Sequence, residues 1–264
     1  MRLLKLTPII VILFLLTISC GSSQKTVMTA VSSLRPRIDQ GDTIIYETQL
    51  ITNSRMFIDS YEYPELQYYG KAKIYTIVTE TKGDSTSFKS GFIDANASLR
   101  KTGFRLSSIH IKNSIYLDWD NLEGKELEYT LTPDGLTKDS DDEIDHFIWL
   151  LFPFFPPEEP VTVGTSWKRE IGDDLTINYR FLEMKGDNAI IEFKYKYKGV
   201  KEPEDSEIDE TIFEEETKAK VELNTKSGKV VKIDMGSDEK RTAKMGQHRL
   251  KIYNDANWDI KAIE

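Results

Sequence analysis

The chain has 264 residues, and its 44 Asp and Glu outnumber its 35 Lys and Arg, giving a formal net charge of −9. Such an acidic protein is a poor ligand for nucleic acid, because phosphate contacts need a basic surface. It also gains little from charge attraction to anionic lipid. The 39% of hydrophobic residues and 30% of charged residues are typical of a globular body with a wet surface.

The N-terminus has the three-part layout of a secretory signal. A short basic start leads into an apolar centre from Ile9 to Leu16, and the small residue Ser19 precedes Cys20. The alternative is a transmembrane anchor, but a membrane span needs about 20 apolar residues, and Lys5, Thr7 and Pro8 interrupt even the longer stretch from Leu3 to Ile18. We predict that residues 1–19 are a signal peptide that is cleaved between Ser19 and Cys20.

The four residues Thr17-Ile18-Ser19-Cys20 resemble the lipobox of bacterial lipoproteins, although Thr17 stands where that family prefers leucine. The resemblance implies a diacylglycerol thioether on the Cys20 sulfur and usually an acyl chain on its new amino group. Two or three chains anchor a protein far more firmly than one. No aspartate directly follows Cys20, so the resemblance favours an outer-membrane lipoprotein that faces the periplasm, with a Gram-positive cell envelope as the alternative.

The rest of the chain divides into a tether and a body. Residues 20–40 are rich in Ser and Thr with little apolar periodicity, which predicts a lipidated flexible tether. Residues 41–264 contain no further cysteine, so the body has no disulfide and depends on its hydrophobic core. We expect a single β-rich domain there, although the predicted helix could separate two β halves.

Most of the body has the composition and alternation of β-strands. We expect strands over 43–51, 73–80, 104–117 and 247–253. The clearest is 189–198, where Phe193, Tyr195 and Tyr197 share one face and lysines occupy the other. Turn residues at 185–188 and at 227–228 predict two hairpins, which join 176–184 to 189–198 and 219–225 to 229–235.

One segment departs from the β pattern. Ser140-Asp141-Asp142-Glu143 forms a capping box, and the apolar residues that follow have helical spacing. They include Phe147 and Leu151, and Trp149 widens the apolar face beyond what a surface helix needs. We predict an amphipathic helix over about 141–152, which Pro153 ends and which packs on the concave face of the sheet.

These features together define the expected fold: mainly β, with a large curved antiparallel sheet or open half-barrel and one helix. An export signal, a long antiparallel sheet and a helix at its mouth resemble the LolA/LolB-type open β-barrel proteins of bacterial envelopes. Residues 160–167 also resemble a P-V-x-V-G-x-x-W element of uncharacterised periplasmic β-proteins. Its physical interpretation is a turn at Gly164 and then a strand opened by an aromatic residue. Neither resemblance assigns a ligand-binding residue.

The sequence offers little for catalysis. Its three histidines are His110, His146 and His248, and no nucleophile elbow or phosphate loop accompanies them. The alternating acids at 139–145 begin like a calcium loop, but Ile144 and Leu150 stand where that loop needs glycine and glutamate, so the helix cap is the better interpretation. We predict no catalytic residues, no metal site and no cofactor; a hydrolase with scattered carboxylates is a third hypothesis.

Residues 202–216 contain nine acids and no base. We interpret this run as a solvated loop and a charged edge strand that resists aggregation, with a docking site for a basic partner as the alternative.

Two function hypotheses follow. The first is a non-catalytic, membrane-anchored envelope lipoprotein that binds an acyl chain, another hydrophobic ligand or an envelope protein. Its candidate cavity residues are Phe147, Trp149, Leu151, Phe193, Tyr195 and Tyr197. The second is a glycan-binding lipoprotein, in which tyrosines beside turn residues stack on sugars; its candidate recognition residues are Tyr61, Tyr63, Tyr68 and Tyr69. The same tyrosines could instead pack a loop onto the sheet.

Overall fold

The computed structural model describes residues 34, 39–83, 85–101, 123–132, 135–138, 160–171, 175–201 and 211–263. Within these residues every regular element is a β-strand, which confirms the mainly β prediction. No helix in this part of the chain is long and apolar enough to cross a membrane. The predicted helix over 141–152, the predicted strand over 104–117 and the signal with Cys20 lie outside the described residues.

Most of the described strands are long. They are β1 (Thr43–Ile58), β2 (Tyr61–Glu62), β3 (Leu66–Lys82), β4 (Ser85–Lys101), β5 (Glu126–Thr132), β6 (Gly135–Lys138), β7 (Ser166–Ile171), β8 (Leu175–Lys185), β9 (Asn188–Lys201), β10 (Thr211–Asn224), β11 (Val230–Met245) and β12 (His248–Ala262).

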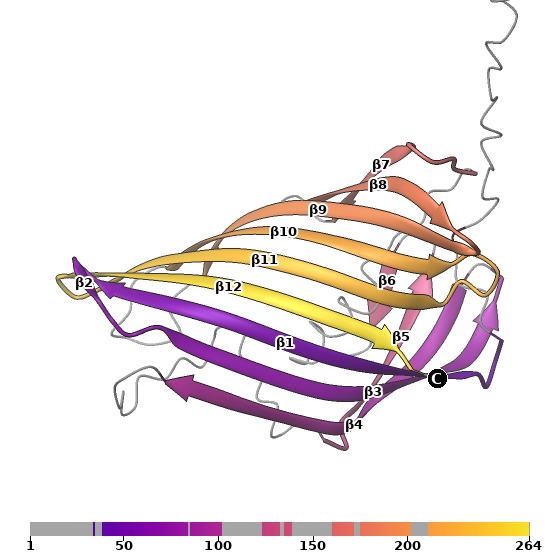
Figure 1. The fold of residues 1–264 in the computed structure, drawn as a ribbon, viewed down its shortest axis with the longest axis horizontal. Helices are drawn as coiled ribbons and strands as arrows, with labels where there is room; N and C mark the ends of the chain where they lie inside the picture. Colours follow the sequence, from indigo (N-terminus) through magenta and orange to yellow (C-terminus); the bar gives the residue numbers. More distant parts are fainter. Residues whose placement is uncertain are drawn as a thin grey trace, which may run out of the picture.

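The strands form one antiparallel sheet in the order β6-β5-β4-β3-β1-β12-β11-β10-β9-β8-β7, with β2 paired to β1. Strands β1 to β6 thus form one side of the sheet and strands β7 to β12 form the other. The two sides meet at a seam, where β1 pairs with β12 from Tyr46 opposite Ala262 to Ile58 opposite Leu250. Figure 1 shows the long strands side by side and the sheet curling out of its plane toward β5 and β6. The path ends at β6 and β7, so the sheet is open, as the sequence predicts.

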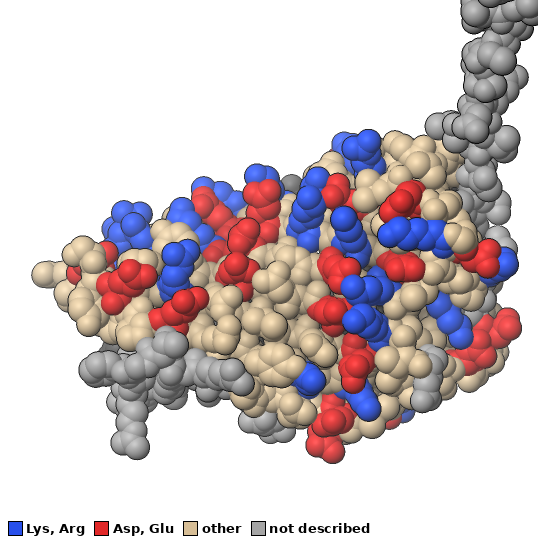
Figure 2. Space-filling view, viewed as in Figure 1, with Lys and Arg blue, Asp and Glu red and all other residues tan. Residues whose placement is uncertain are grey.

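Side chains alternate between the two faces of the sheet, apart from register shifts in the β3–β4, β8–β9 and β10–β11 pairs. In β1 the buried residues Ile44, Tyr46 and Leu50 alternate with more exposed neighbours. We call the face that carries Tyr46 and Leu50 the inner face and the opposite one the outer face. Lysines and acids intermingle on the outer face (Figure 2), where they form ion pairs such as Lys196–Glu216. The hydrophobic core therefore lies along the inner face.

Both predicted hairpins are present. Gly186 has a φ of 61° in the turn between β8 and β9, and Gly228 has a φ of 68° between β10 and β11. Glycine adopts these angles without steric cost. At the second turn the Asn224 Oδ1 accepts hydrogen bonds from the backbone N–H groups of Lys226 and Ser227.

The element at 160–167 also folds as its residues predict. Gly164 lies in a turn and has a φ of 93°. Its backbone N–H donates to the carbonyl of Phe181 at 2.8 Å. Trp167 follows in β7 and stacks on Tyr179 of β8, with ring centroids 5.3 Å apart. The turn and the aromatic pair fix the register at this edge of the sheet.

The loop after β1 is tied to the β11–β12 hairpin. The Asp59 carboxylate accepts hydrogen bonds from the Arg249 backbone N–H at 2.8 Å and from His248 Nδ1 at 2.7 Å. These two bonds, led by the one from Arg249, hold the pKa of the Asp59 carboxyl below its usual value. His248 therefore has a structural partner at this end of the sheet.

Two candidate ligand-binding faces

The inner face carries rows of apolar side chains that run across neighbouring strands. Cross-strand partners share a face, so the register of the sheet defines each row. One row runs from β1 to β7 through Leu50, Trp258, Met235, Ala219, Phe193, Tyr179 and Trp167. The next row runs from β12 to β8 through Ile260, Ile233, Val221, Ile191 and Phe181. Together they make a continuous apolar surface.

The aromatic residues predicted on β9 do share the inner face, but their surroundings differ. Phe193 is buried in the apolar row beside Tyr179. Tyr195 donates its hydroxyl hydrogen to Glu215 at 2.8 Å, and the Tyr197 ring packs on Phe213 at 5.1 Å. The other predicted cavity residues, which are Phe147, Trp149 and Leu151, lie outside the described residues.

Farther along the strands, the inner face becomes polar. Glu215 Oε1 accepts hydrogen bonds from the hydroxyls of Tyr195, Thr217 and Ser237, at 2.8, 2.8 and 2.9 Å. Thr217 and Ser237 are buried. Burial of the Tyr195 phenol, with the neighbouring carboxylate, raises its pKa, so the hydroxyl stays protonated and acts as a donor. Sequence reasoning did not anticipate this cluster.

A second carboxylate lies directly across from the first. Glu239 of β11 is the cross-strand partner of Glu215 and is only 6% exposed. The Arg241 guanidinium pairs with it, with one nitrogen 3.2 Å from Glu239 Oε2, and Asn254 Nδ2 donates to Glu239 Oε1 at 3.4 Å. On the four central strands β1, β12, β11 and β10, the charged side chains that face inward between the strand ends are Glu215, Glu239 and Arg241.

Within the part of the chain that the structure describes, several buried polar atoms on the inner face have no hydrogen-bond partner. They are the Tyr46 hydroxyl, Thr48 Oγ1, Thr52 Oγ1 and Asn254 Oδ1. Thr52 is 1% exposed and Asn254 is 3% exposed. Burying such groups without a partner costs free energy, so each one calls for an explanation.

These positions correct our interpretation of the acidic run at 202–216. Its described part, 211–216, begins β10, which lies between β9 and β11 and is not an edge strand. Glu214 and Glu216 face outward, in ion pairs with lysines. Glu215 faces inward because strand alternation places every second residue there. The charge count alone could not identify the one glutamate that turns toward the core.

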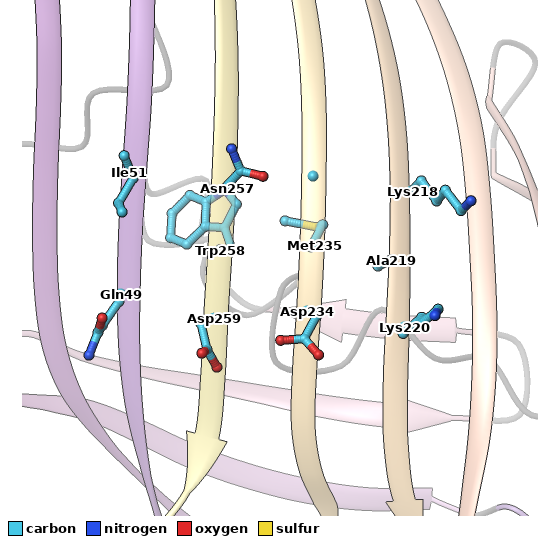
Figure 3. Close-up of a pocket in the computed structure, with 11 residues that line it drawn as sticks. Gln49, Ile51, Lys218, Ala219, Lys220, Asp234, Met235, Asn257, Trp258 and Asp259 are labelled. Atoms are coloured by element: carbon cyan, nitrogen blue, oxygen red, sulfur yellow. The ribbon is translucent and has the colours of Figure 1, made fainter.

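The outer face contains a groove of about 490 Å³ over the same four central strands. Figure 3 shows Gln49 and Ile51 of β1, Asn257 and Asp259 of β12, Asp234 of β11, and Lys218 and Lys220 of β10 around it. Gly236 lies between Asn257 and Lys218 in the register. Because Gly236 has no side chain, the sheet backbone forms the floor of the groove.

Hydrogen-bond acceptors gather at this groove. Asp234 and Asp259 are cross-strand partners, and each is paired with a lysine on one side, at 2.6 Å to Lys232 and 3.2 Å to Lys261. Asp259 Oδ1 is buried and has no partner. The Asn257 amide donates to Asp255, and its Oδ1 lies 3.6 Å from the place where a Cβ on Gly236 would stand.

The four predicted recognition tyrosines do not form one platform. Tyr61 and Tyr63 contact each other edge to face at 5.0 Å, and Tyr61 is 65% exposed. Tyr68 is buried on the inner face, whereas Tyr69 lies on the outer face with the Lys71 ammonium 5.7 Å from its ring centroid. Consecutive strand residues point to opposite faces. Tyr69 is the cross-strand partner of Ile51 and therefore lies beside the groove.

Within the described part of the chain, no three His, Cys, Asp or Glu side chains gather in a way that could hold a metal ion. His110 and His146 lie outside the described residues.

No family model matches the chain, and no curated protein matches it. Among solved structures, it is similar to lipovitellin in a structure that describes lipid–protein interactions. That match has a TM-score of 0.51 and 9% identity, and covers 86% of this chain and 25% of the lipovitellin chain. The chain thus spans a quarter of the length of lipovitellin, and the likeness shows a related β-sheet fold.

Two further structures align over most of their length but with low TM-scores. An outer membrane channel from Pseudomonas putida F1 gives a TM-score of 0.23 with 8% identity, over 86% of this chain and 97% of the channel. The translocator domain of the autotransporter NalP from Neisseria meningitidis gives 0.18 with 8% identity, over 83% and 88%. Neither likeness carries an argument about this protein.

Proposed function

We propose that this protein is a non-catalytic, membrane-anchored lipoprotein of the cell envelope that binds a lipid or another hydrophobic ligand on the inner face of its sheet. The observation that carries the proposal is the continuous apolar surface made by the row from Leu50 to Trp167 and the row beside it. The row from Leu50 crosses seven strands spaced about 4.8 Å apart, roughly 30 Å in all, which suits an extended acyl chain.

Two other features support this function. Lipovitellin, whose β-sheet fold is similar, is a protein with described lipid–protein interactions. The signal that ends at Ser19-Cys20 would deliver the protein to the envelope and anchor it, most simply at the outer membrane facing the periplasm. An acidic protein needs such an anchor, because charge does not draw it to anionic lipid.

The first experiment maps the ligand contact residue by residue. The full-length protein, in non-ionic detergent, is irradiated with a photoreactive fatty-acid analogue, and the crosslinked residues are identified by mass spectrometry. We expect labelling of inner-face residues such as Met235 and Trp258. Labelling confined to outer-face neighbours such as Asp234 and Lys218 would overturn the proposal, as would an absence of labelling.

Two adjacent residues provide matched variants for the same experiment. Leu50→Gln places a polar group in the inner row, whereas Ile51→Gln makes a similar change on the outer face, where Ile51 is 40% exposed. We expect the first variant to reduce labelling several-fold and the second to leave it unchanged. Circular dichroism of both variants checks that the sheet is intact.

The outer groove supports a second candidate function, binding of a glycan. Its amide and carboxylate acceptors and its lysine donors suit a polyhydroxylated ligand, while Ile51 with Tyr69 beside it offers an apolar wall. A groove of this volume falls within the range of small-ligand sites. The recognition element is then the groove and not the 61–69 loop that the sequence suggests.

Gly236→Val tests the glycan hypothesis. A Cβ at this position meets only Asn257 Oδ1, at ordinary contact distance, and valine suits a strand. We expect the variant to keep the wild-type melting temperature or exceed it, and to lose at least tenfold in affinity for any oligosaccharide that the wild-type protein binds in a glycan array. If the variant binds the oligosaccharide as tightly as the wild type does, or if the wild type binds no glycan, the groove is not a glycan site.

A further inference from the structure

We propose that the polar end of the inner face is a head-group subsite for an amphipathic lipid whose head donates hydrogen bonds. The subsite comprises Thr52, Glu215, Glu239, Arg241 and Asn254. This inference rests on the proposed function, because the apolar rows must hold the acyl chain for the head to reach these residues. It adds the orientation of the ligand and the chemistry of its head.

The register of the sheet places the subsite directly beside the apolar row. Thr52 follows Leu50 on the inner side of β1, and Asn254 is the cross-strand partner of Ser54, the next inward residue. Glu239 is opposite Asn254, and Glu215 is opposite Glu239. Two residues of strand cover about 6.6 Å. A ligand whose acyl chain lies along the row from Leu50 therefore has its polar head within reach of the subsite.

Two of the four unpartnered buried atoms of the inner face lie at this end of it, beside the carboxylates. Asn254 is 3% exposed, and its Nδ2 donates to Glu239, but its Oδ1 has no partner. Thr52 is 1% exposed, and its hydroxyl is also without a partner. An unmet buried acceptor is costly, and a hydroxyl or ammonium of a ligand would satisfy Asn254 Oδ1.

The charges of the subsite select the chemistry of the head. The subsite contains two carboxylates and one guanidinium, which pairs with Glu239, so the described cluster carries one net negative charge when all three groups are ionised. One carboxylate oxygen of Glu215 already accepts three hydroxyl hydrogens. Another anion, such as a free fatty-acid carboxylate, would face repulsion. A glycerol or ethanolamine head would instead donate to the acceptors.

Competition in native mass spectrometry tests the subsite. The full-length protein in non-ionic detergent is offered equal amounts of a monoacylglycerol, a fatty-acid methyl ester and a free fatty acid of the same chain length. We expect the wild type to retain the monoacylglycerol at least tenfold over the other two. A preference for the free fatty acid would overturn the subsite while leaving the proposed function intact, whereas failure to retain any of the three would contradict both.

Isosteric variants test which residues cause the preference for monoacylglycerol. Thr52→Val and Asn254→Leu should reduce the preference for monoacylglycerol several-fold while the methyl ester still binds.

The control is Thr48→Val, the same change on the same strand and face, at another buried hydroxyl without a partner. About 13 Å of strand separate it from Thr52, so it should leave the preference unchanged. Thr52→Val replaces an unpartnered hydroxyl with a methyl group, so it should not lower the melting temperature. An unchanged preference in a folded Thr52→Val, or an equal loss in Thr48→Val, would refute the assignment.

Discussion

Replacing Phe181 with alanine should lower the free energy of unfolding by about 3–5 kcal/mol, the usual cost of removing a fully buried ring. Phe181 is 0% exposed and lies opposite Ile191, which is also fully buried. Its backbone N–H and carbonyl bond the turn at Thr165 and Gly164. Phe181 belongs to the cluster of buried core residues, so removing its ring leaves a cavity among them.

Thermal and urea unfolding of the full-length protein measure this loss. For a protein of this size the change corresponds to a fall in melting temperature of roughly 6–20 °C. Tyr61→Ala is the matched control, since it removes a ring that is 65% exposed and should cost less than about 1 kcal/mol. Equal losses in the two variants would mean that the inner face is not the hydrophobic core.

Replacing Cys20 with serine should abolish lipidation of the protein. Cys20 is the only cysteine in the chain and follows the apolar part of the predicted signal. Serine offers no sulfur for the diacylglycerol thioether, and the lipoprotein peptidase should leave the signal largely uncut. Partitioning into the detergent phase and incorporation of labelled palmitate measure the loss of lipidation.

Ser22→Ala is the control for the anchor, because it lies two residues beyond the cysteine and leaves Ser19-Cys20 unchanged. It should incorporate palmitate like the wild type. If Cys20→Ser incorporates palmitate equally well, the protein is not lipidated at this position and the proposed anchoring must be abandoned.

Local patterns in the sequence predicted local structure well. The alternation over 189–198 identified the face that Phe193 shares with Tyr195 and Tyr197, and the turn residues at 185–188 and 227–228 identified two hairpins. These features depend on interactions between neighbours in the chain, which composition and spacing encode directly. Strand lengths were underestimated: β1 runs to Ile58 although its apolar run ends near residue 51.

Pairing between distant segments could not be predicted in the same way. Nothing near Glu215 in the sequence indicates that Glu239 and Ser237 lie beside it, since their positions follow from the register of β10 with β11. The outer groove likewise depends on Gly236 lying between residues of two other strands. Of the tyrosines at 61–69, only Tyr69 is placed beside that groove, because alternation turns Tyr68 inward.

The seam between β1 and β12 has a consequence for how the protein is made. Tyr46, near the start of the body, pairs with Ala262, near its end. Such pairings close very long loops and therefore form slowly. The two runs of strands cannot be joined until β12 has been synthesised, so a nascent chain still lacks the strand that completes the centre of its sheet. A chain that cannot close its core early stays incompletely folded for longer, which would suit the export that we propose for this protein.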